Sequence, residues 1–361
     1  MKTNLERLKE ALFIEGDSGA DGALLTSEPN CRYLTGFPCS SRTILVTKEE
    51  VYFLTDFRYG EAARKKIQGC AIVEYRDARR SLEELLRRHN IKTLLLEYDN
   101  LSYGESEKYR SICEGLGVEP VLDRTLDTVL RTLRAVKQPW EIERLKASQA
   151  ITDAAFTHIL PYLKEGATER EIALEIEFFM KKNGAEDIAF DLIVVSGENG
   201  SQCHGVPGQR TLRKGDFITM DTGAVLDGYH SDMTRTVALG FVTEEQRDVY
   251  ETVLKAQTSA AEAVRPNIPC RMVDWVARSI IDEKYSGTFG HSTGHSVGIE
   301  IHEWPAFSPS CETLTEPGMV ITVEPGIYLE GKFGVRIEDM VLVTETGREN
   351  LTHSPKELMI L

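Results

Sequence analysis

Apolar and polar positions along the first third of the chain alternate between the periods of short strands and amphipathic helices. The strand candidates are Gly22–Leu25, Thr43–Val46, Val51–Leu54, Ala71–Glu74, Lys92–Leu96 and Val118–Leu122. The helical candidates lie near Leu5–Phe13, Gly60–Lys66, Leu82–His89 and Ser106–Leu116. This alternation predicts a modest α/β domain with its own core. The segment contains no glycine-rich phosphate loop and no catalytic constellation.

The pattern becomes almost continuously helical between residues 125 and 165. Pro139 stands where the first turn of a helix tolerates proline, directly before a long helical run. A chain of 361 residues is also too long for one typical domain. We therefore expect a boundary near 125–137, with a first domain at 1–130 and a second domain at 131–361 that opens with these helices.

Capping boxes and glycine stops mark the helices of the second domain. Expected features are a helix from Thr168-x-x-Glu171 to Asn183-Gly184, a strand at Ile188–Val195, a helix after Thr243-x-x-Gln246, and a helix at about Arg271–Tyr285 that ends at Gly287. Helix, glycine stop, strand and histidine-bearing loop thus occur twice, around residues 168–204 and 271–302. This order suggests an internal duplication.

Two aspartates flank a predicted hairpin within Gly215–Arg235. Asp227-Gly228 is a strong signal for a two-residue turn, and the resulting register places Asp221 opposite Thr234. Asp221 and Asp232 then lie on one face as diagonal neighbours. Paired carboxylates in an apolar sheet need a shared proton, an arginine or a metal ion to neutralise them. Two solvated hairpin aspartates are the alternative.

Five of the eight histidines fall between residues 204 and 302. They are His204, His230, His291, His295 and His302. His291 and His295 share a face in either a strand or a helix, because a spacing of four fits both periods. A single histidine here is more often a satisfied core or loop group, and the clustering of five weakens that interpretation without removing it.

Two glutamates lie in apolar strand-like runs near the C-terminus. Glu324 ends MVITVEPG, and Glu338 lies inside VRIEDMVLV, where it needs a partner. Arg336, on the same strand face, is one such partner, and a metal ion is the other. Carboxylates with one imidazole suit manganese, iron, cobalt or zinc, and paired ions hydrolyse stable bonds. The residues alone indicate a metallohydrolase, without separating a peptidase from a phosphoesterase.

Composition removes several classes of function. A net charge of −15 argues against a basic nucleic-acid surface and against an anionic-membrane patch. No apolar run approaches the roughly 20 residues of a membrane span, and the charged N-terminus does not fit a signal peptide. Seven scattered cysteines without a C-x-x-C pair form no disulfide or zinc framework, which favours a reducing cytoplasm.

At these residues the chain resembles the pita-bread metallopeptidases, which include Xaa-Pro aminopeptidases, prolidases and methionine aminopeptidases. The matching blocks are SGENGSQCHGVP (196–207), MDTGAVLDGYHSDMTRT (220–236), FGHSTGHSVGIEIHE (289–303), MVITVEPGIY (319–328) and GVRIEDMVLV (334–343). NCRYLTGF (30–37) and FLTDFRY (53–59) resemble a creatinase-type N-terminal domain. Methionine aminopeptidases lack that domain, which points to the proline-specific branch.

The resemblance implies an α/β creatinase-type domain followed by an α+β pita-bread catalytic domain with an internal pseudo-two-fold repeat. It implies that the site binds two divalent metal ions, with manganese as the first candidate and cobalt, zinc or iron as the others. Asp232 and Glu338 would bridge both ions, Asp221 would hold one, and His295 with Glu324 the other. A metal-bridging hydroxide would attack the scissile carbonyl, with Glu324 carrying the proton.

The resemblance also assigns the remaining site residues and the partners. His204 and His302 would contact the substrate, and His291 would line its pocket. Arg336 would contact the metal ligands without binding a metal ion itself. Substrates would be peptides with proline at the second position, and relatives are often homodimers. Cys203 replaces a common proline and Ser296 a common glycine, and neither change removes a ligand.

Two other readings of the same fold stay open at this point. One is a metal-free, creatinase-like C–N hydrolase, and the other is a non-catalytic binding module. Both kinds of protein have usually lost metal ligands, whereas all five are present here.

Overall fold

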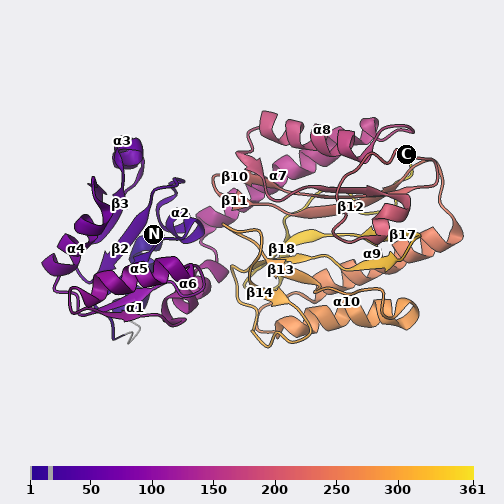
Figure 1. Cartoon of the computed structure of the whole chain (residues 1–361). Helices are drawn as coiled ribbons and strands as arrows, with labels where there is room; N and C mark the ends of the chain where they lie inside the picture. Colours follow the sequence, from indigo (N-terminus) through magenta and orange to yellow (C-terminus); the bar gives the residue numbers. More distant parts are fainter. Residues whose placement is uncertain (1, 15–18) are drawn as a thin grey trace. The chain divides into compact units, whose positions relative to one another are not determined.

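The computed structural model describes residues 2–14 and 19–361 and divides the chain into two compact units, Met1–Arg134 and Ala135–Leu361 (Figure 1). The division falls at the end of helix α6 (Thr125–Ala135), so this helix belongs to the first unit and does not open the second. The reason is tertiary: Tyr33 donates to the Leu133 carbonyl, and Arg134 donates to the Asn30 side chain.

The first unit is built on a six-stranded mixed sheet in the order β4-β3-β2-β1-β5-β6. Its strands are β1 (Gly22–Leu25), β2 (Thr43–Thr47), β3 (Val51–Thr55), β4 (Ala71–Glu74), β5 (Thr93–Leu96) and β6 (Glu119–Val121). Its other helices are α1 (Asn4–Phe13), α2 (Glu28–Thr35), α3 (Phe57–Lys66), α4 (Ala78–Arg88) and α5 (Tyr103–Glu114). The predicted α/β domain is confirmed. Helix α2 was not predicted, since it is short and has a proline as its second residue.

The first half of the second unit contains α7 (Pro139–Ile159), α8 (Glu169–Lys182) and two short 3-10 turns, η1 (Leu160–Tyr162) and η2 (Gly197–Ser201). One three-stranded sheet has the order β12-β9-β8, with β8 (Ile193–Ser196), β9 (Phe217–Thr222) and β12 (Met233–Ala238). The other has the order β11-β10-β7, with β7 (Asp187–Ile188), β10 (Ala224–Leu226) and β11 (Tyr229–His230).

The single strand predicted at Ile188–Val195 is wrong. Residue Ile188 pairs with β10, whereas Ile193 pairs with β9, so the two ends join different sheets. An apolar run shows that a segment is buried, but it does not show which neighbour binds each end.

The second half contains the helices α9 (Glu244–Ala263) and α10 (Cys270–Tyr285) and a five-stranded sheet in the order β14-β13-β15-β18-β19. Its strands are β13 (Gly294–Ser296), β14 (Glu303–Phe307), β15 (Val320–Val323), β18 (Asp339–Val343) and β19 (Arg348–Asn350). A separate ribbon joins β16 (Gly326–Leu329) to β17 (Phe333–Arg336). The capping boxes predicted at Thr168 and Thr243 are both present.

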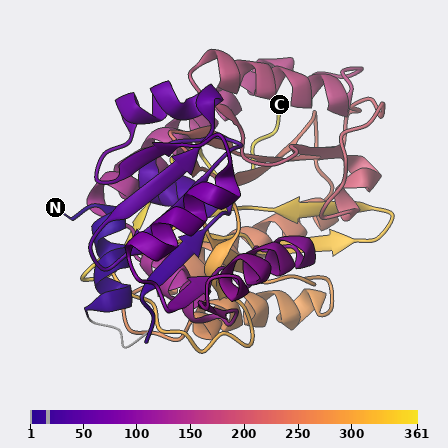
Figure 2. The ribbon, with the colours of Figure 1, turned by 60° about the vertical axis from the view of Figure 1, so that its left-hand side comes forward.

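The strands of the second unit lie between two pairs of helices. Figure 1 shows α7 and α8 on one side of the strands and α9 and α10 on the other, and Figure 2 shows the same layers after rotation. Each pair covers its own core: Ile172 and Met220 belong to one cluster, and Val253 and Ile321 to the other. Within the described residues, no helix is both long and apolar enough to cross a membrane.

Candidate metal centre

The hairpin expected around Asp227 forms in the expected register. Asp227 and Gly228 have φ values of 49° and 87°, and a type I′ two-residue turn requires a positive φ at both of these positions. Asp221 lies opposite Thr234, and the charge of Asp221 raises the pKa of Asp232, after desolvation by burial. The two aspartates therefore share one face of the hairpin.

Residues from the other half of the unit meet these aspartates. The ligand atoms of Asp232, His295 and Glu338 all lie within 4.8 Å of one another. His295 Nε2 lies 3.4 Å from Asp232 Oδ2 and 3.4 Å from Glu324 Oε1. His295 lies on β13, Glu324 follows β15, and Glu338 stands between β17 and β18. All of these positions are strand ends or lie beside them, so the sheets hold the cluster rigidly.

Arg336 pairs with Asp221. Its Nη2 lies 2.7 Å from Asp221 Oδ2, whereas its Nε donates to Thr234 Oγ1 at 3.0 Å. Thr234 Oγ1 in turn donates to Glu338 Oε2 at 2.7 Å. The guanidinium therefore reaches Glu338 only through a hydroxyl, and it is not the direct partner that the sequence offered as one alternative.

The carboxylates of this cluster carry more negative charge than the surrounding side chains balance. Burial first, and neighbouring carboxylates second, raise the pKa of Asp232 and of Glu338, and burial raises the pKa of Glu324. Within the described residues, Asp221 Oδ1 and Glu338 Oε1 are buried without a hydrogen-bond partner. Such oxygens are costly unless a proton or a cation binds them.

The histidine completes a donor set that suits a divalent cation. His295 Nδ1 lies 3.1 Å from the Ser296 carbonyl, which only accepts, so Nδ1 carries the proton. The lone pair on Nε2 then faces the carboxylates of Asp232 and Glu324. A carbonyl that fixes the tautomer of a histidine in this way is typical of a metal ligand. The residues present therefore fit a carboxylate-rich metal centre.

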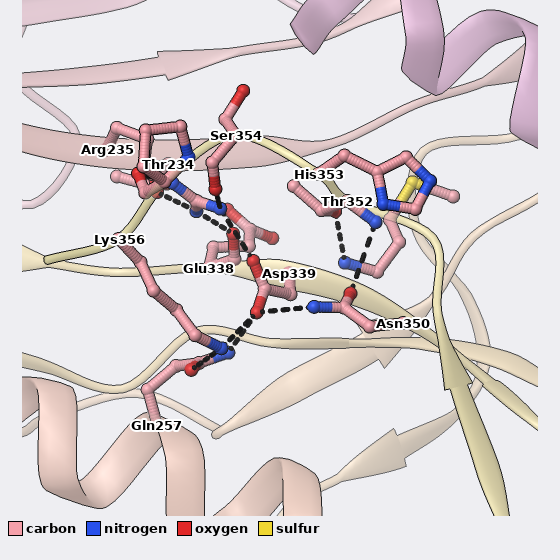
Figure 3. A network of polar contacts seen from close by, with 12 residues as sticks. Thr234, Arg235, Gln257, Glu338, Asp339, Asn350, Thr352, His353, Ser354 and Lys356 are labelled. Carbon is pink, nitrogen blue, oxygen red and sulfur yellow. Dashed lines mark hydrogen bonds and ion pairs between the residues drawn. The ribbon is translucent and has the colours of Figure 1, made fainter.

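A buried polar network holds the backbone at the Glu338 carbonyl and at Asp339 (Figure 3). Asp339 is fully buried and accepts from Arg235 Nη2 at 2.8 Å and from Lys356 Nζ at 2.7 Å. Gln257 and Asn350 donate to the same carboxylate at 2.9 and 3.0 Å. Arg235 also donates to the Glu338 carbonyl. This network fixes where β18 begins and so where the Glu338 carboxylate points.

A cavity of about 930 Å³ opens onto the cluster. Its lining joins the polar residues Cys203, His204, Asp221, Asp232, His291, His295, His302, Glu324 and Arg336 to an apolar wall formed by Phe190, Leu192, Ile193, Val206 and Ile301. His204 and His302 are both exposed in it, and the rings of His302 and His295 lie edge to face at 4.4 Å between centroids. A few convergent polar groups against an apolar wall are typical of a small-molecule or peptide site.

His291 is held as a neutral group in the wall of this cavity. Arg336 Nη1 donates to the Tyr328 hydroxyl at 2.9 Å, which leaves that hydroxyl to donate to His291 Nε2 at 2.9 Å. His291 Nδ1 donates to the Ser292 carbonyl at 2.8 Å. Burial lowers the pKa of His291 to about 4 and raises that of Tyr328 to about 12.

Two residues of the site were not identified from the sequence. Tyr328 has one available signal, since it lies four positions after Glu324 beyond a Pro-Gly stop. Thr234 has none, because a threonine inside a strand is ordinary. His230, one of the clustered histidines, lies outside the cavity lining and binds the Gly298 carbonyl through its backbone N–H at 2.8 Å.

Comparisons with known proteins match both units. Residues 143–345 match the model of metallopeptidase family M24, and residues 5–136 match that of the creatinase/prolidase N-terminal domain. An Xaa-Pro dipeptidase of Pyrococcus furiosus is 37% identical over 98% of this chain and 99% of its own. The solved structure of an Xaa-Pro dipeptidase from Bacillus anthracis has a TM-score of 0.92 at 40% identity and covers 99% of both chains. That of an X-Pro aminopeptidase from Thermotoga maritima has a TM-score of 0.88 at 34% identity, over 95% of this chain and 98% of its own.

Proposed function

The chain belongs to metallopeptidase family M24, and we propose that it is a two-metal exopeptidase that cleaves the bond between an N-terminal residue and proline. The observation that supports this most directly is the convergence of the ligand atoms of Asp232, His295 and Glu338 within 4.8 Å, beside buried carboxylate oxygens that have no hydrogen-bond partner among the described residues. Such a cluster has a physical reason to exist if cations bind it.

We assign the five ligands as the family resemblance implies. Asp221, Asp232, His295, Glu324 and Glu338 would hold the two ions between them. When bound, divalent ions polarise a carbonyl and lower the pKa of water to near neutrality. Manganese is the first candidate, because carboxylate-rich sites favour hard ions. Cobalt, zinc and iron are the others.

The protein's own groups would then orient the substrate and carry protons. Glu324 would carry a proton between water and the leaving amine, since burial raises the pKa of its carboxyl above the ordinary value and so makes it a better proton acceptor. His204 and His302 are exposed in the cavity and would contact the substrate around the scissile bond. Partial burial, and then His295, lower the pKa of His302, which favours a neutral hydrogen-bonding ring. His291 would line the pocket.

The substrate class rests on the relatives and on the cavity. The named relatives are an Xaa-Pro dipeptidase of Pyrococcus furiosus and an X-Pro aminopeptidase of Thermotoga maritima. A cavity of about 930 Å³ with an apolar wall has room for proline and at least one flanking residue on either side. We further propose a cytoplasmic homodimer, as the cysteine usage and the family resemblance suggest.

A direct assay tests the proposal. Purified protein is stripped of metal, reloaded with Mn²⁺, Co²⁺ or Zn²⁺, and offered Ala-Pro, Ala-Pro-Ala and the control Ala-Ala-Ala. We expect metal-dependent release of alanine from the two proline peptides and none from the control. Glu324→Ala should abolish turnover in a folded protein. Turnover that survives a chelator, or none with any of the three ions, would refute the proposal. The ratio of kcat/KM for Ala-Pro and Ala-Pro-Ala separates a dipeptidase from an aminopeptidase.

A further inference from the structure

A buried ion pair joins Lys137 to Glu303, the first residue of β14. Lys137 Nζ is 3.2 Å from Glu303 Oε2, and their side chains are only 1% and 4% exposed. Two charges removed from water are tolerated only where each compensates the other, so the position of one constrains the other. Lys137 is itself anchored, because its backbone N–H donates to the Gly318 carbonyl at 3.0 Å.

The Glu303 carboxylate shapes the loop between β13 and β14. Glu303 pairs with Ser296 at the base of the loop, and its Oε1 accepts the backbone N–H of Glu300 at 3.2 Å. Gly298 leaves the necessary room, because a Cβ there would lie 2.6 Å from Glu303 Oε2. The carboxylate thus takes the place of a turn residue inside the loop, with Lys137 as its counter-charge.

His302 is the residue directly before Glu303. The Glu303 side chain is buried, whereas the His302 side chain lines the cavity and packs against His295. We propose that the Lys137–Glu303 ion pair is a positioning element that sets the orientation of the His302 ring. The proposal rests on the proposed function, in which His302 contacts the substrate.

The test compares the kcat of several variants in the native background and in the His302→Ala background. Lys137→Met, Glu303→Gln and the double variant are compared in the native background and with His302→Ala. The double variant removes both charges of the pair together, which keeps the test available if a single variant fails to fold. We expect each to lower kcat for Ala-Pro by about 10–100-fold, because a misplaced catalytic group costs that much. With His302→Ala already present, the further loss should be less than about twofold.

Controls distinguish positioning from a general loss of structure. Lys146→Met removes the cation of another ion pair in the same unit, with Glu349 at 2.9 Å, and should leave kcat unchanged. The proposal would be overturned if the variants lowered kcat by the same factor in the His302→Ala background as in the native background. A double variant with native kcat would overturn it too.

Hydrogen exchange of residues 297–302 supplies a readout that does not depend on catalysis. It should accelerate in Lys137→Met and not in Lys146→Met, and equal exchange in both would overturn the proposal as well. If the native protein cleaves no Xaa-Pro peptide, the proposed function fails, whereas this exchange comparison still decides the role of the ion pair.

Discussion

Replacing Asp339 by asparagine removes one negative charge from the centre of the network in Figure 3 with almost no change of volume. Burial raises the pKa of Asp339, but Arg235 and Lys356 outweigh it and hold that pKa below its ordinary value, so the carboxylate is ionised at neutral pH. Lys356 is partly exposed and can turn to solvent. Arg235 is 2% exposed and cannot, so its charge stays buried and uncompensated.

The loss of stability follows from the buried charge of Arg235, which no longer has a carboxylate partner. Breaking a buried ion pair from one side costs about 3–5 kcal/mol. At about 2–4 °C per kcal/mol for a unit of this size, the thermal midpoint should fall by roughly 6–20 °C. Lys332→Met is the control, because its pair with Glu245 is 57% and 49% exposed and contributes less than about 1 kcal/mol.

Thermal unfolding of native protein, Asp339→Asn and Lys332→Met under one buffer condition measures these differences. The difference between native protein and Asp339→Asn should also shrink as the pH falls below about 4, because a lowered carboxyl pKa stabilises the fold above the unfolded value and loses that contribution in acid. A midpoint for Asp339→Asn within about 2 °C of the control would refute the reasoning.

Three further predictions concern the metal centre. Burial raises the pKa values of Asp232, Glu324 and Glu338. Metal-free protein should therefore lose stability as the pH rises above the ordinary carboxyl pKa range, while the stability of metal-loaded protein increases relative to it. A difference between their thermal midpoints that stays constant with pH would contradict this. His291→Gln should lower kcat/KM without moving the acidic limb of the pH profile, because burial lowers the pKa of His291 to about 4; a limb displaced by more than about half a unit would show that His291 titrates in turnover. Gly223→Ala should cost about 1–3 kcal/mol and reduce bound metal, since its Cβ would lie 2.1 Å from the Ser231 carbonyl oxygen. Gly290→Ala, where nothing lies within 4 Å of the new Cβ, is the matched control, and equal metal content in both would contradict the prediction.

Only the tertiary structure decided which charged residues of the site pair with one another. Arg336 lies only two residues from Glu338, yet its ion pair is with Asp221, which is 115 positions away. The hydroxyl of Tyr328 then links Arg336 to His291. Periodicity reports which face a side chain occupies, but the distance to a group on another sheet depends on how the sheets pack.

The same limit explains the errors in the element assignments. The run Ile188–Val195 is apolar except at Asp191, but its two ends join different sheets. Helix α6 has the pattern of the helices that follow it, yet its last turn hydrogen-bonds to the first unit. The ion pair between Lys137 and Glu303 spans 166 positions, and the sequence gives no local sign of it.

The sequence by itself determined the features that depend on a few neighbouring residues. The Asp227-Gly228 turn and the two-residue period of the strands placed Asp221 and Asp232 on one face, as the structure confirms. Helix starts at the capping boxes follow in the same way from local hydrogen bonds. Tertiary structure alone brought His295, Glu324 and Glu338 to that face, because contacts across 60 to 120 residues are made by the packing of sheets, which no local backbone preference encodes.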